Sequence, residues 1–182
     1  MGAEKTRTTV VMDGEALGRA VTRIAHEIAE KNAGSLDDLI IVGIRARGDV
    51  LAKRIQVALN RRIEKQVPFG VLDITLYRDD VGSRAALPRS TDIPFSINGK
   101  IVVLIDDVLY TGRSVRAAMD ALVDFGRPQG IQLVVLIDRG HRELPIKPDY
   151  VGKNIPTQPQ ANVKVELEET DGRDIVVVEE AA

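Results

Sequence analysis

The sequence lacks cysteine and tryptophan altogether, and His26 and His141 are its two histidines among 182 residues. Without cysteine the chain can form no disulfide, thiol nucleophile, zinc finger or iron–sulfur cluster. Two histidines are too few for a three-histidine metal site. Aromatic residues make up 3% of the chain against 44% for hydrophobic residues as a whole, so the core has to be aliphatic.

Long hydrophobic runs are missing as well. The longest aliphatic runs, such as residues 101–105, span about five residues, whereas a membrane-spanning helix needs about 20. The N-terminal segment has no apolar stretch of the kind found in secretory signals, and we expect its polar residues to fray. We therefore expect a cytoplasmic protein that makes no membrane contact and folds as one domain over residues 1–182.

Neither sign of charge dominates the composition. The chain has 25 lysines and arginines and 27 aspartates and glutamates, a net charge of −2, which argues against a uniformly basic nucleic-acid-binding protein. The charge is nevertheless divided along the chain. Residues 154–182 hold two basic and seven acidic residues, a net of −5, so residues 1–153 hold 23 and 20, a net of +3. A mildly basic body therefore precedes an acidic C-terminal segment.

Helix and strand patterns alternate through the first half of the sequence. Asp13 is a suitable N-cap for a helix that runs to about Asn32, along which aliphatic residues recur at helical spacing. The pattern then predicts, in order, a buried strand, a tight loop, a second helix and a further strand, at residues 39–44, 45–48, 49–65 and 69–77.

The alternation continues in the second half, after a long polar stretch. Residues 79–99 are rich in polar residues, glycine and proline, which is typical of a functional loop. A strand, a helix, a strand and a hairpin are predicted at residues 101–105, 114–125, 131–138 and 162–180, the hairpin turning at Asp171-Gly172. The order indicates an α/β protein with a central, mostly parallel sheet flanked by helices and with ligands at the carboxyl ends of its strands.

Residues 102–114 carry the most specific pattern. Four aliphatic residues form a buried strand, and Asp106 and Asp107 are expected just past its end. The polar turn 111–114 then leads into a helix, whose first backbone amides can bind a phosphate. The carboxylates can accept hydrogen bonds from ribose hydroxyls or hold Mg²⁺. The pattern is distinct from a Walker A loop, whose G-x-x-x-x-G-K-[ST] is absent.

This segment resembles the phosphoribosyl-pyrophosphate (PRPP) signature of type I phosphoribosyltransferases. The resemblance implies the fold of that family, with a flexible lid loop and a small hood, to which the C-terminal hairpin is added here. It implies that Asp106 and Asp107 hold the ribose hydroxyls while residues 111–114 cradle the 5′-phosphate. The implied PRPP and UMP contacts are Arg45, Arg47, Asp106, Asp107, Val108, Leu109, Tyr110, Thr111, Gly112, Arg113 and Ser114.

Tyr110 departs from the pattern of the family, in which a small or acidic residue is usual at this place. In purine-using relatives an acid here is the proposed base toward the ring. Tyrosine therefore argues against a purine substrate and leaves the general base unassigned, because a phenol with a pKa of about 10 is a poor base at neutral pH.

Two further segments are predicted to act on the diphosphate. Arg45 and Arg47 stand in the loop after residues 39–44, where the family places its pyrophosphate loop, and guanidinium groups bind phosphates through charge-assisted hydrogen bonds. Arg78 opens the lid loop and is assigned to balance the departing diphosphate. The candidate catalytic residues are thus Asp106, Asp107 and Arg78, and the candidate contacts of the cofactor Mg²⁺, held mostly through PRPP or diphosphate, are Asp106, Asp107, Asp79 and Asp80.

Residues 139–153 form a basic patch with four lysines or arginines and two acidic residues. With residues 73–80 and 109–113, this patch is similar to the family of pyrimidine-operon regulators that are also uracil phosphoribosyltransferases, and the similarity extends from about residue 21 to residue 157. The resemblance implies uracil as substrate and binding of the pyr operon leader mRNA, helped by UMP or UTP. The implied RNA contacts are Thr22, His26, His141, Arg142, Lys147 and Lys153, whose chemistry suits phosphates and loop bases.

Three functions stay open at this point. The main hypothesis joins the reaction of uracil and PRPP to UMP and diphosphate with regulation through RNA. The second is an RNA-binding regulator with a vestigial PRPP site, suggested by the missing acid at position 110. The third is a phosphoribosyltransferase for another base, such as hypoxanthine or orotate, without an RNA role. The resemblance implies a homodimer or larger homo-oligomer, and transcription attenuation and translational repression both fit the sequence.

Overall fold

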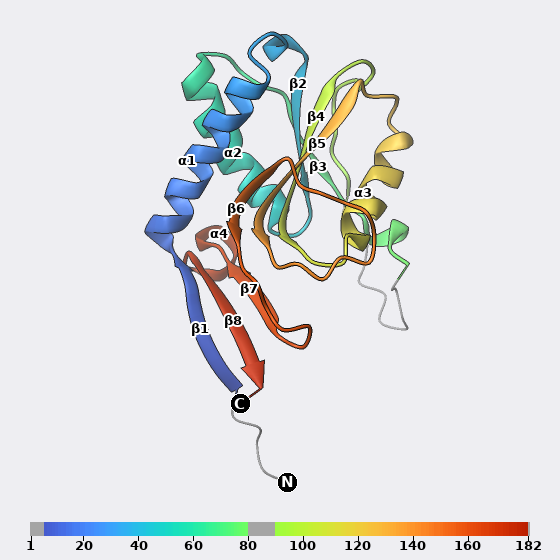
Figure 1. Cartoon of the computed structure of the whole chain (residues 1–182). Coiled ribbons are helices and arrows are strands. Elements are labelled where there is room, and N and C mark those ends of the chain that lie inside the picture. The colour runs from blue at the N-terminus through green and yellow to red at the C-terminus, as the bar shows by residue number, and fades with distance from the viewer. Residues whose placement is uncertain (1–5, 80–89, 182) are drawn as a thin grey trace.

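Two β-sheets organise the part of the chain that the computed structural model describes, residues 6–79 and 90–181 (Figure 1). The larger sheet is parallel, with the strand order β3-β2-β4-β5-β6 and the bounds Phe69–Leu72, Leu39–Ile44, Ile101–Leu109, Gly130–Asp138 and Tyr150–Asn154. The smaller sheet is antiparallel, with the order β1-β8-β7 and the bounds Thr6–Asp13, Ile175–Ala181 and Asn162–Glu166. The predicted central parallel sheet is confirmed.

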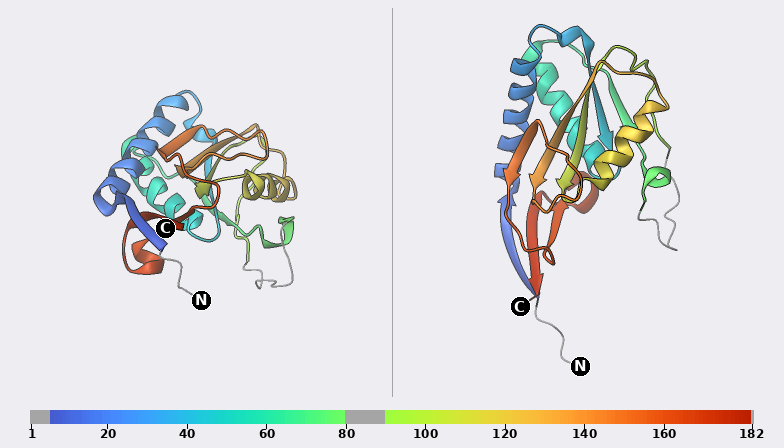
Figure 2. Two further views of the ribbon diagram at one scale, coloured as in Figure 1. Left: turned by 60° about the horizontal axis from the view of Figure 1, so that its bottom comes forward. Right: turned by 45° about the vertical axis from the view of Figure 1, so that its right-hand side comes forward.

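Helices cover both faces of the larger sheet. α1 (Gly14–Lys31) and α2 (Gly48–Ile63) lie on one face and α3 (Arg113–Val123) on the other, as Figure 2 shows. β4 alternates accordingly, because Val103 and Ile105 belong to the buried cluster beneath α1 and α2, whereas Val102 and Leu104 belong to the cluster beneath α3. All four side chains are fully buried, as expected for the central strand of a parallel sheet.

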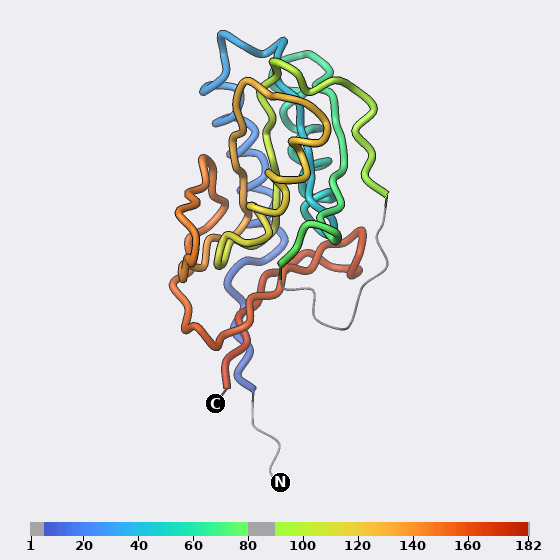
Figure 3. Tube along the Cα trace, turned by 90° about the vertical axis from the view of Figure 1, so that its right-hand side faces the viewer, coloured from blue at the N-terminus to red at the C-terminus, as the bar shows by residue number. Residues whose placement is uncertain are grey.

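The hood, which we define as the smaller sheet together with the short helix α4 (Glu168–Asp171), is built from both ends of the described chain. β1 pairs with β8, and Figure 3 follows the two segments side by side. Leu167 and Val176 of the hood are fully buried in the same cluster as Leu17 and Ile24 of α1. The hood is therefore anchored on the helices that cover the larger sheet. None of the helices in the described part of the chain is both long and apolar enough to cross a bilayer.

The helices begin and end close to their predicted bounds. Asp13 caps α1 as expected, because its carboxylate accepts a hydrogen bond from the Ala16 amide at 2.8 Å. α2 and α3 lie within two residues of the predicted ranges 49–65 and 114–125, which is the ordinary uncertainty of a helix end.

The strand predicted over residues 69–77 is wrong beyond Leu72, where β3 ends. Asp73 accepts hydrogen bonds from the backbone amide of Thr75 at 2.9 Å and from its hydroxyl at 2.6 Å. These local bonds offer the backbone an alternative to sheet pairing, and a 3₁₀ turn at Thr75–Tyr77 follows.

Three other differences arise from pairing between distant segments. β4 continues to Leu109, opposite Asp138 of β5, so Asp106 and Asp107 lie inside the strand and not past its end. β1 is a paired strand where fraying was expected, and β6 was not predicted. The C-terminal hairpin is confirmed, but its connection contains a short helix, α4, which ends at Asp171 within the predicted turn. Local sequence patterns carry little information on such long-range partners.

Tyr150 of β6 belongs to a buried polar cluster with Asn32 and Gln132. Its hydroxyl donates to Gln132 Oε1 at 2.6 Å, and Gln132 Nε2 donates to Asn32 Oδ1 at 2.8 Å. Burial raises the pKa of Tyr150 to about 12, whereas an unfolded tyrosine ionises with a pKa of about 10. The unfolded chain loses the proton first, so the stabilisation is present below about pH 10 and is lost between about pH 10 and 12.

We therefore expect Tyr150→Phe to lower the free energy of unfolding by about 1 kcal/mol at pH 8, the net value of a typical hydrogen bond. The deficit relative to the natural chain should shrink as the pH rises from 10 to 12. Urea denaturation followed by circular dichroism measures both quantities. Tyr77→Phe, which removes an exposed hydroxyl bonded to Asp124, is the control with a smaller expected effect. A deficit that grows with pH would contradict the assignment.

Candidate functional site

The site lies where the loops after β2 and β4 meet. The two strands are parallel neighbours, with Gly43 opposite Ile105, so their carboxyl ends lie side by side. Gly48 begins α2 directly against β4, because a Cβ at this position would lie 2.7 Å from the Ile105 carbonyl oxygen and 3.2 Å from Asp106 Cα. A side chain would push the two segments apart. The glycine thus lets residues 45–48 approach the carboxylate-bearing end of β4.

Asp106 and Asp107 are the charged centre of the site. Asp106 is 7% exposed, and its burial, followed by the charge of Asp107, raises its pKa well above the ordinary value. Burial also raises the pKa of Asp107, although the Val108 amide donates to its carboxylate at 2.8 Å. The pair has too few donors to stabilise its full charge. A ligand that brings hydroxyl groups or a cation would supply what is missing.

The loop after β4 forms an anion site at the N-terminus of α3. Gly112 precedes the helix with a φ of 94°, a left-handed conformation that glycine adopts without strain, and the amides of the first turn have no partner within the helix. A cavity of about 280 Å³ opens here. It is lined by Arg78, Asp106, Val108, Leu109, Tyr110, Thr111, Gly112, Arg113, Ser114, Val115 and Glu143. The predicted residues 108–114, Asp106 and Arg78 therefore share one cavity, which suits a ligand with both phosphate and hydroxyl groups.

Tyr110 is held in place by its neighbours. The guanidinium carbon of Arg139 lies 4.1 Å from the centre of the Tyr110 ring, and His141 makes an edge contact with 6.1 Å between ring centroids. The Tyr110 hydroxyl donates to the Pro159 carbonyl at 3.1 Å. Arg139 is 6% exposed, and it is a site neighbour that the sequence analysis missed, because nothing in the local sequence separates a buried arginine from a basic surface patch.

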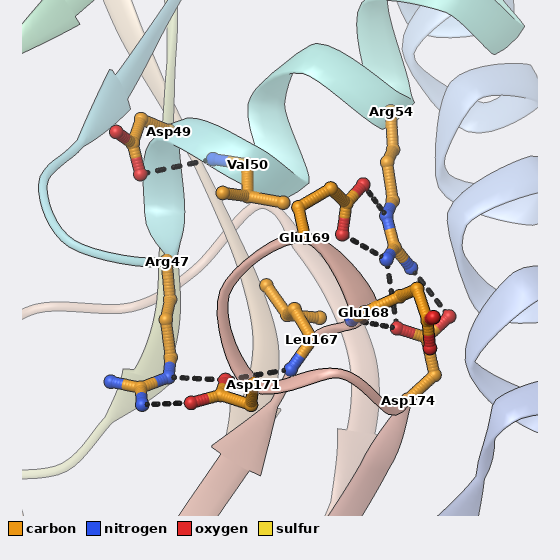
Figure 4. A network of polar contacts seen from close by, with 9 residues as sticks. All are labelled: Arg47, Asp49, Val50, Arg54, Leu167, Glu168, Glu169, Asp171 and Asp174. Carbon is orange, nitrogen blue, oxygen red and sulfur yellow. Dashed lines mark hydrogen bonds and ion pairs between the residues drawn. The ribbon is translucent and has the colours of Figure 1, made fainter.

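Arg45 and Arg47 flank Ala46 in the loop before α2. Arg45 Nη1 lies 3.8 Å from Asp49 Oδ2, and its buried Nε meets no acceptor among the described residues. Arg47 reaches the hood instead, where its Nη2 donates to Asp171 Oδ1 at 2.9 Å (Figure 4). The two arginines predicted to bind diphosphate thus differ, since one keeps a buried donor available and the other is held by a carboxylate.

The hood brings acidic residues to α2 that the sequence analysis assigned only to a hairpin. Arg54, two helical turns after Arg47, donates to Asp174 Oδ2 at 2.8 Å and to Glu169 Oε1 at 2.8 Å (Figure 4). The signal was the acidic run over residues 166–174, but the sequence alone did not name its partner on a helix more than 100 residues away.

Arg113 draws Asp79 toward the loop that precedes α3. Its Nη1 donates to Asp79 Oδ2 at 2.6 Å, and its Nε donates to Glu143 Oε2 at 2.7 Å. Asp80, also predicted as a metal contact, lies outside the described residues. Within residues 6–79 and 90–181 no three acidic or histidine side chains gather as metal ligands. The neighbouring carboxylates of Asp106 and Asp107 are oxygen donors of the kind that Mg²⁺ takes when it binds together with a phosphate ligand.

The residues predicted to contact RNA fall in two regions. Thr22 and His26 are exposed on α1 and line a shallow hollow of about 560 Å³ along that helix. Arg23, between them, donates to two carbonyls of β6 at 3.0 and 2.7 Å, so α1 and β6 are joined here. Lys153 extends from β6 toward β1, where its Nζ donates to the Val11 carbonyl at 2.7 Å.

The other region is the loop between β5 and β6, which packs on the loop after β4. His141 Nε2 lies 2.6 Å from the Thr157 carbonyl. The guanidinium of Arg142 is fully engaged with the protein, as it donates to Asp138 Oδ2 at 2.6 Å and to the Tyr110 and Ile146 carbonyls at 3.0 Å. Lys147 is exposed. Arg142 therefore holds this loop together, whereas Lys147 faces solvent.

The sequence matches the family model described as the phosphoribosyl transferase domain over residues 8–170. A protein from Roseiflexus sp. (strain RS-1) named Bifunctional protein PyrR is 60% identical over 164 residues, which are 89% of each chain. A protein of the same name from Pelotomaculum thermopropionicum is 55% identical over 184 residues, covering 100% of this chain and 99% of the relative.

Solved structures add a likeness of fold. A hypoxanthine phosphoribosyl transferase of Trypanosoma cruzi superposes with a TM-score of 0.74 at 20% identity, covering 99% of this chain and 94% of that chain. A hypoxanthine phosphoribosyltransferase from Staphylococcus aureus gives a TM-score of 0.64 at 24% identity, covering 82% and 78%. At these identities the likeness concerns the fold alone.

Asp106→Asn tests whether the site holds unfavourable charge. Because the folded state raises the pKa of Asp106, the ionised carboxylate destabilises the fold at pH values above about 4 and does not do so at lower pH. Asparagine keeps the oxygen that accepts the Asp107 amide at 2.9 Å. We expect the free energy of unfolding to rise by about 1 kcal/mol at pH 8, the scale of typical single-residue effects, and the gain to vanish near pH 4.

Urea denaturation at the two pH values measures this gain. Asp120→Asn is the matched control, because it removes the same charge from an exposed pair with Arg116 and should change stability by less than about 0.5 kcal/mol. An Asp106→Asn protein that is less stable than the natural chain at pH 8 would show that other residues already satisfy the carboxylate.

Proposed function

We propose two activities for this chain, which belongs to the phosphoribosyltransferase family and, within it, to the PyrR proteins. It converts uracil and PRPP to UMP and diphosphate, and it regulates pyrimidine genes by binding the leader mRNA of the pyr operon in a way that depends on uridine nucleotides. The observation that carries the first activity is the buried carboxylate of Asp106, which lies next to Asp107 in β4 and lines one cavity with the N-terminus of α3.

Each part of PRPP finds a matching group in the site. Asp106 and Asp107 accept hydrogen bonds from the ribose hydroxyls, which compensates their desolvation. The amides at the start of α3 and the Thr111 hydroxyl hold the 5′-phosphate. Arg45 and Arg47 receive the diphosphate through charge-assisted hydrogen bonds. The reaction forms a bond between uracil N1 and C1 of the ribose, breaks the bond from that carbon to diphosphate, and releases the N1 proton of uracil to water or to the departing diphosphate.

Mg²⁺ is part of this proposal as a companion of the diphosphate. It would neutralise charge on the leaving group, and Asp106 and Asp107 would hold it together with the phosphate oxygens. Arg78 lines the same cavity, where its positive charge lowers the pKa of Asp106 and where it would balance the departing diphosphate.

Uracil fits better than a purine because Tyr110 takes the place of an acidic residue. Its ring is fixed between Arg139 and His141 and its hydroxyl is bound to Pro159. A phenol held in this way presents no carboxylate to the imidazole part of a purine. The protein would act in the cytoplasm, where its mRNA partner is made, and as a homodimer or larger homo-oligomer.

The RNA site is proposed on the two regions that carry Thr22, His26 and Lys153 on one side and His141, Arg142 and Lys147 on the other. The loop between β5 and β6 donates backbone amides of Glu143 and Leu144 to the Thr111 carbonyl, at 3.0 and 3.1 Å. A nucleotide bound at Thr111 would therefore contact a residue that is hydrogen-bonded directly to the loop that bears Lys147. If UMP tightens RNA binding, RNA must tighten UMP binding by the same factor.

The catalytic proposal predicts that replacing both Asp106 and Asp107 by asparagine lowers kcat/KM for PRPP by at least about 100-fold, because two charge-assisted hydrogen bonds are lost. Release of diphosphate from PRPP, uracil and Mg²⁺ is the measurement, with Asp120→Asn as the matched control.

An unchanged rate refutes the site. Turnover of hypoxanthine or orotate but not uracil identifies a transferase for another base. Absence of turnover with any base, alongside UMP-dependent RNA binding, identifies a regulator with a vestigial site.

The RNA proposal predicts that Lys147→Gln and His26→Ala each weaken binding of the leader RNA and leave uracil turnover unchanged. Loss of a phosphate contact by Lys147 should also reduce the salt dependence of binding by about one ion. Gel-shift titrations at several salt concentrations, with and without UMP, provide the test. Arg62→Gln, which removes an exposed positive charge from the far end of α2, is the control. Equal losses in Lys147→Gln and Arg62→Gln would indicate non-specific attraction.

A further inference from the structure

Arg47 is held along one edge by the hood. It stands at the N-cap of α2 with a φ of 68°, a left-handed conformation that a non-glycine residue rarely adopts. Its Nη2 donates to Asp171 Oδ1 at 2.9 Å and its Nε to Asp171 Oδ2 at 3.3 Å. Its Nη1 meets no acceptor among the described residues, and Figure 4 shows this nitrogen pointing away from Asp171. The guanidinium thus has one occupied edge and one available edge.

Asp171 is itself fixed by the backbone. Its Oδ2 accepts a hydrogen bond from the Leu167 amide at 2.9 Å, and its own amide donates to the Leu167 carbonyl at 2.6 Å. Leu167 is fully buried. The carboxylate that receives Arg47 is therefore placed by a residue of the core, although it lies on a short surface helix.

Arg54 of α2 binds the C-terminal segment at a second point. It donates through Nη1 and Nη2 to the two carboxylate oxygens of Asp174, at 2.8 and 2.7 Å, and it also binds Glu169 with two nitrogens. Arg54 follows Arg47 by seven residues, about two turns of helix, so both side chains project toward the hood from the same face of α2. Arg47 and Arg54 thus join α2 to α4 at two points, through Asp171 and Glu169.

The charges around Arg47 agree with this arrangement. The hydrogen bonds to Asp171 raise the pKa of Arg47, and the more distant Asp107 raises it further. The hydrogen bond from Arg47 lowers the pKa of Asp171. Arg47 is therefore bonded to the carboxylate of the hood and also feels the charge of Asp107 on β4, and it stands in the loop where the diphosphate of PRPP is proposed to bind.

We propose that Asp171 is a positioning residue for phosphoribosyl transfer, which holds Arg47 by one edge so that its other edge faces the diphosphate of PRPP. This inference rests on the proposed function. A free arginine has many rotamers, and ordering it costs binding energy each time a ligand is bound. The hood removes that cost in advance, which is preorganisation of a ligand contact by a neighbouring hydrogen bond.

The test is Asp171→Asn, compared with the natural chain and with Asp120→Asn as a charge-matched control. We expect KM for PRPP to rise about tenfold, the factor that corresponds to one net hydrogen bond, while kcat changes less than about twofold. Binding of Mg²⁺-diphosphate, followed by calorimetry without uracil, should weaken by a similar factor. A lower KM would mean that Asp171 competes with the ligand, and an unchanged KM would mean that it does not act on Arg47; either result overturns the proposal.

A double-mutant cycle separates positioning from a general structural effect. In an Arg47→Ala background, Asp171→Asn should no longer change KM or diphosphate affinity, because the residue through which it acts is gone. An equal loss in both backgrounds overturns the proposal. If Asp171→Asn folds poorly, Asp171→Glu is the alternative variant, because it keeps the charge and displaces the carboxylate. It should raise KM for PRPP severalfold, and an unchanged KM would also overturn the proposal.

Failure of the proposed function would look different. If the natural chain releases no diphosphate from PRPP and uracil, the transferase activity is refuted. The calorimetric comparison of Mg²⁺-diphosphate binding still tests whether Asp171 acts through Arg47.

Discussion

The parallel pairing of β2 with β4 is the constraint on which the rest of the site depends. It sets the two strand ends beside each other, and the absence of a side chain at Gly48 lets the following loop touch the backbone at Ile105 and Asp106. The loop that bears Arg45 and Arg47 then lies against the strand that bears Asp106 and Asp107, although about 60 residues separate the two segments in the chain. The phosphate and ribose contacts proposed for this site depend on that register.

The buried carboxylates of the site destabilise the fold, and the contacts around the site stabilise it. Asp106 and Asp107 are desolvated side by side, and no cluster of cations among the described residues compensates them fully. The surrounding aliphatic core, together with the hydrogen bonds from Arg47 and Arg54 to the hood, offsets the cost of desolvating these carboxylates. A ligand that brings hydroxyl groups and a cation relieves the same strain, so part of the binding energy comes from charge that the fold has already placed.

The sequence predicted those features of the fold that depend on residues close together in the chain. The cap at Asp13, the helices α1, α2 and α3 and the buried strands β2, β4 and β5 were visible in the sequence, because each depends on neighbouring residues. The extension of β4 past Asp107, the pairing of β1 with β8 and the contact of Arg47 with Asp171 were not, because each depends on a partner far along the chain. Arg142 illustrates the same limit, since its sequence context indicated a basic surface while the structure engages its whole guanidinium with the protein.

The pairing of β1 with β8 also bears on how the chain is made. β1 ends at Asp13 and β8 begins at Ile175, so 161 residues of sequence lie between the two strands. At a synthesis rate of about 5–20 residues per second, β1 waits many seconds on the ribosome before its partner emerges. All five strands of the larger sheet are translated first. The contact between Arg47 and Asp171 is therefore completed late, and a nascent chain interrupted before Asp171 contains every strand of the larger sheet but leaves Arg47 without this carboxylate.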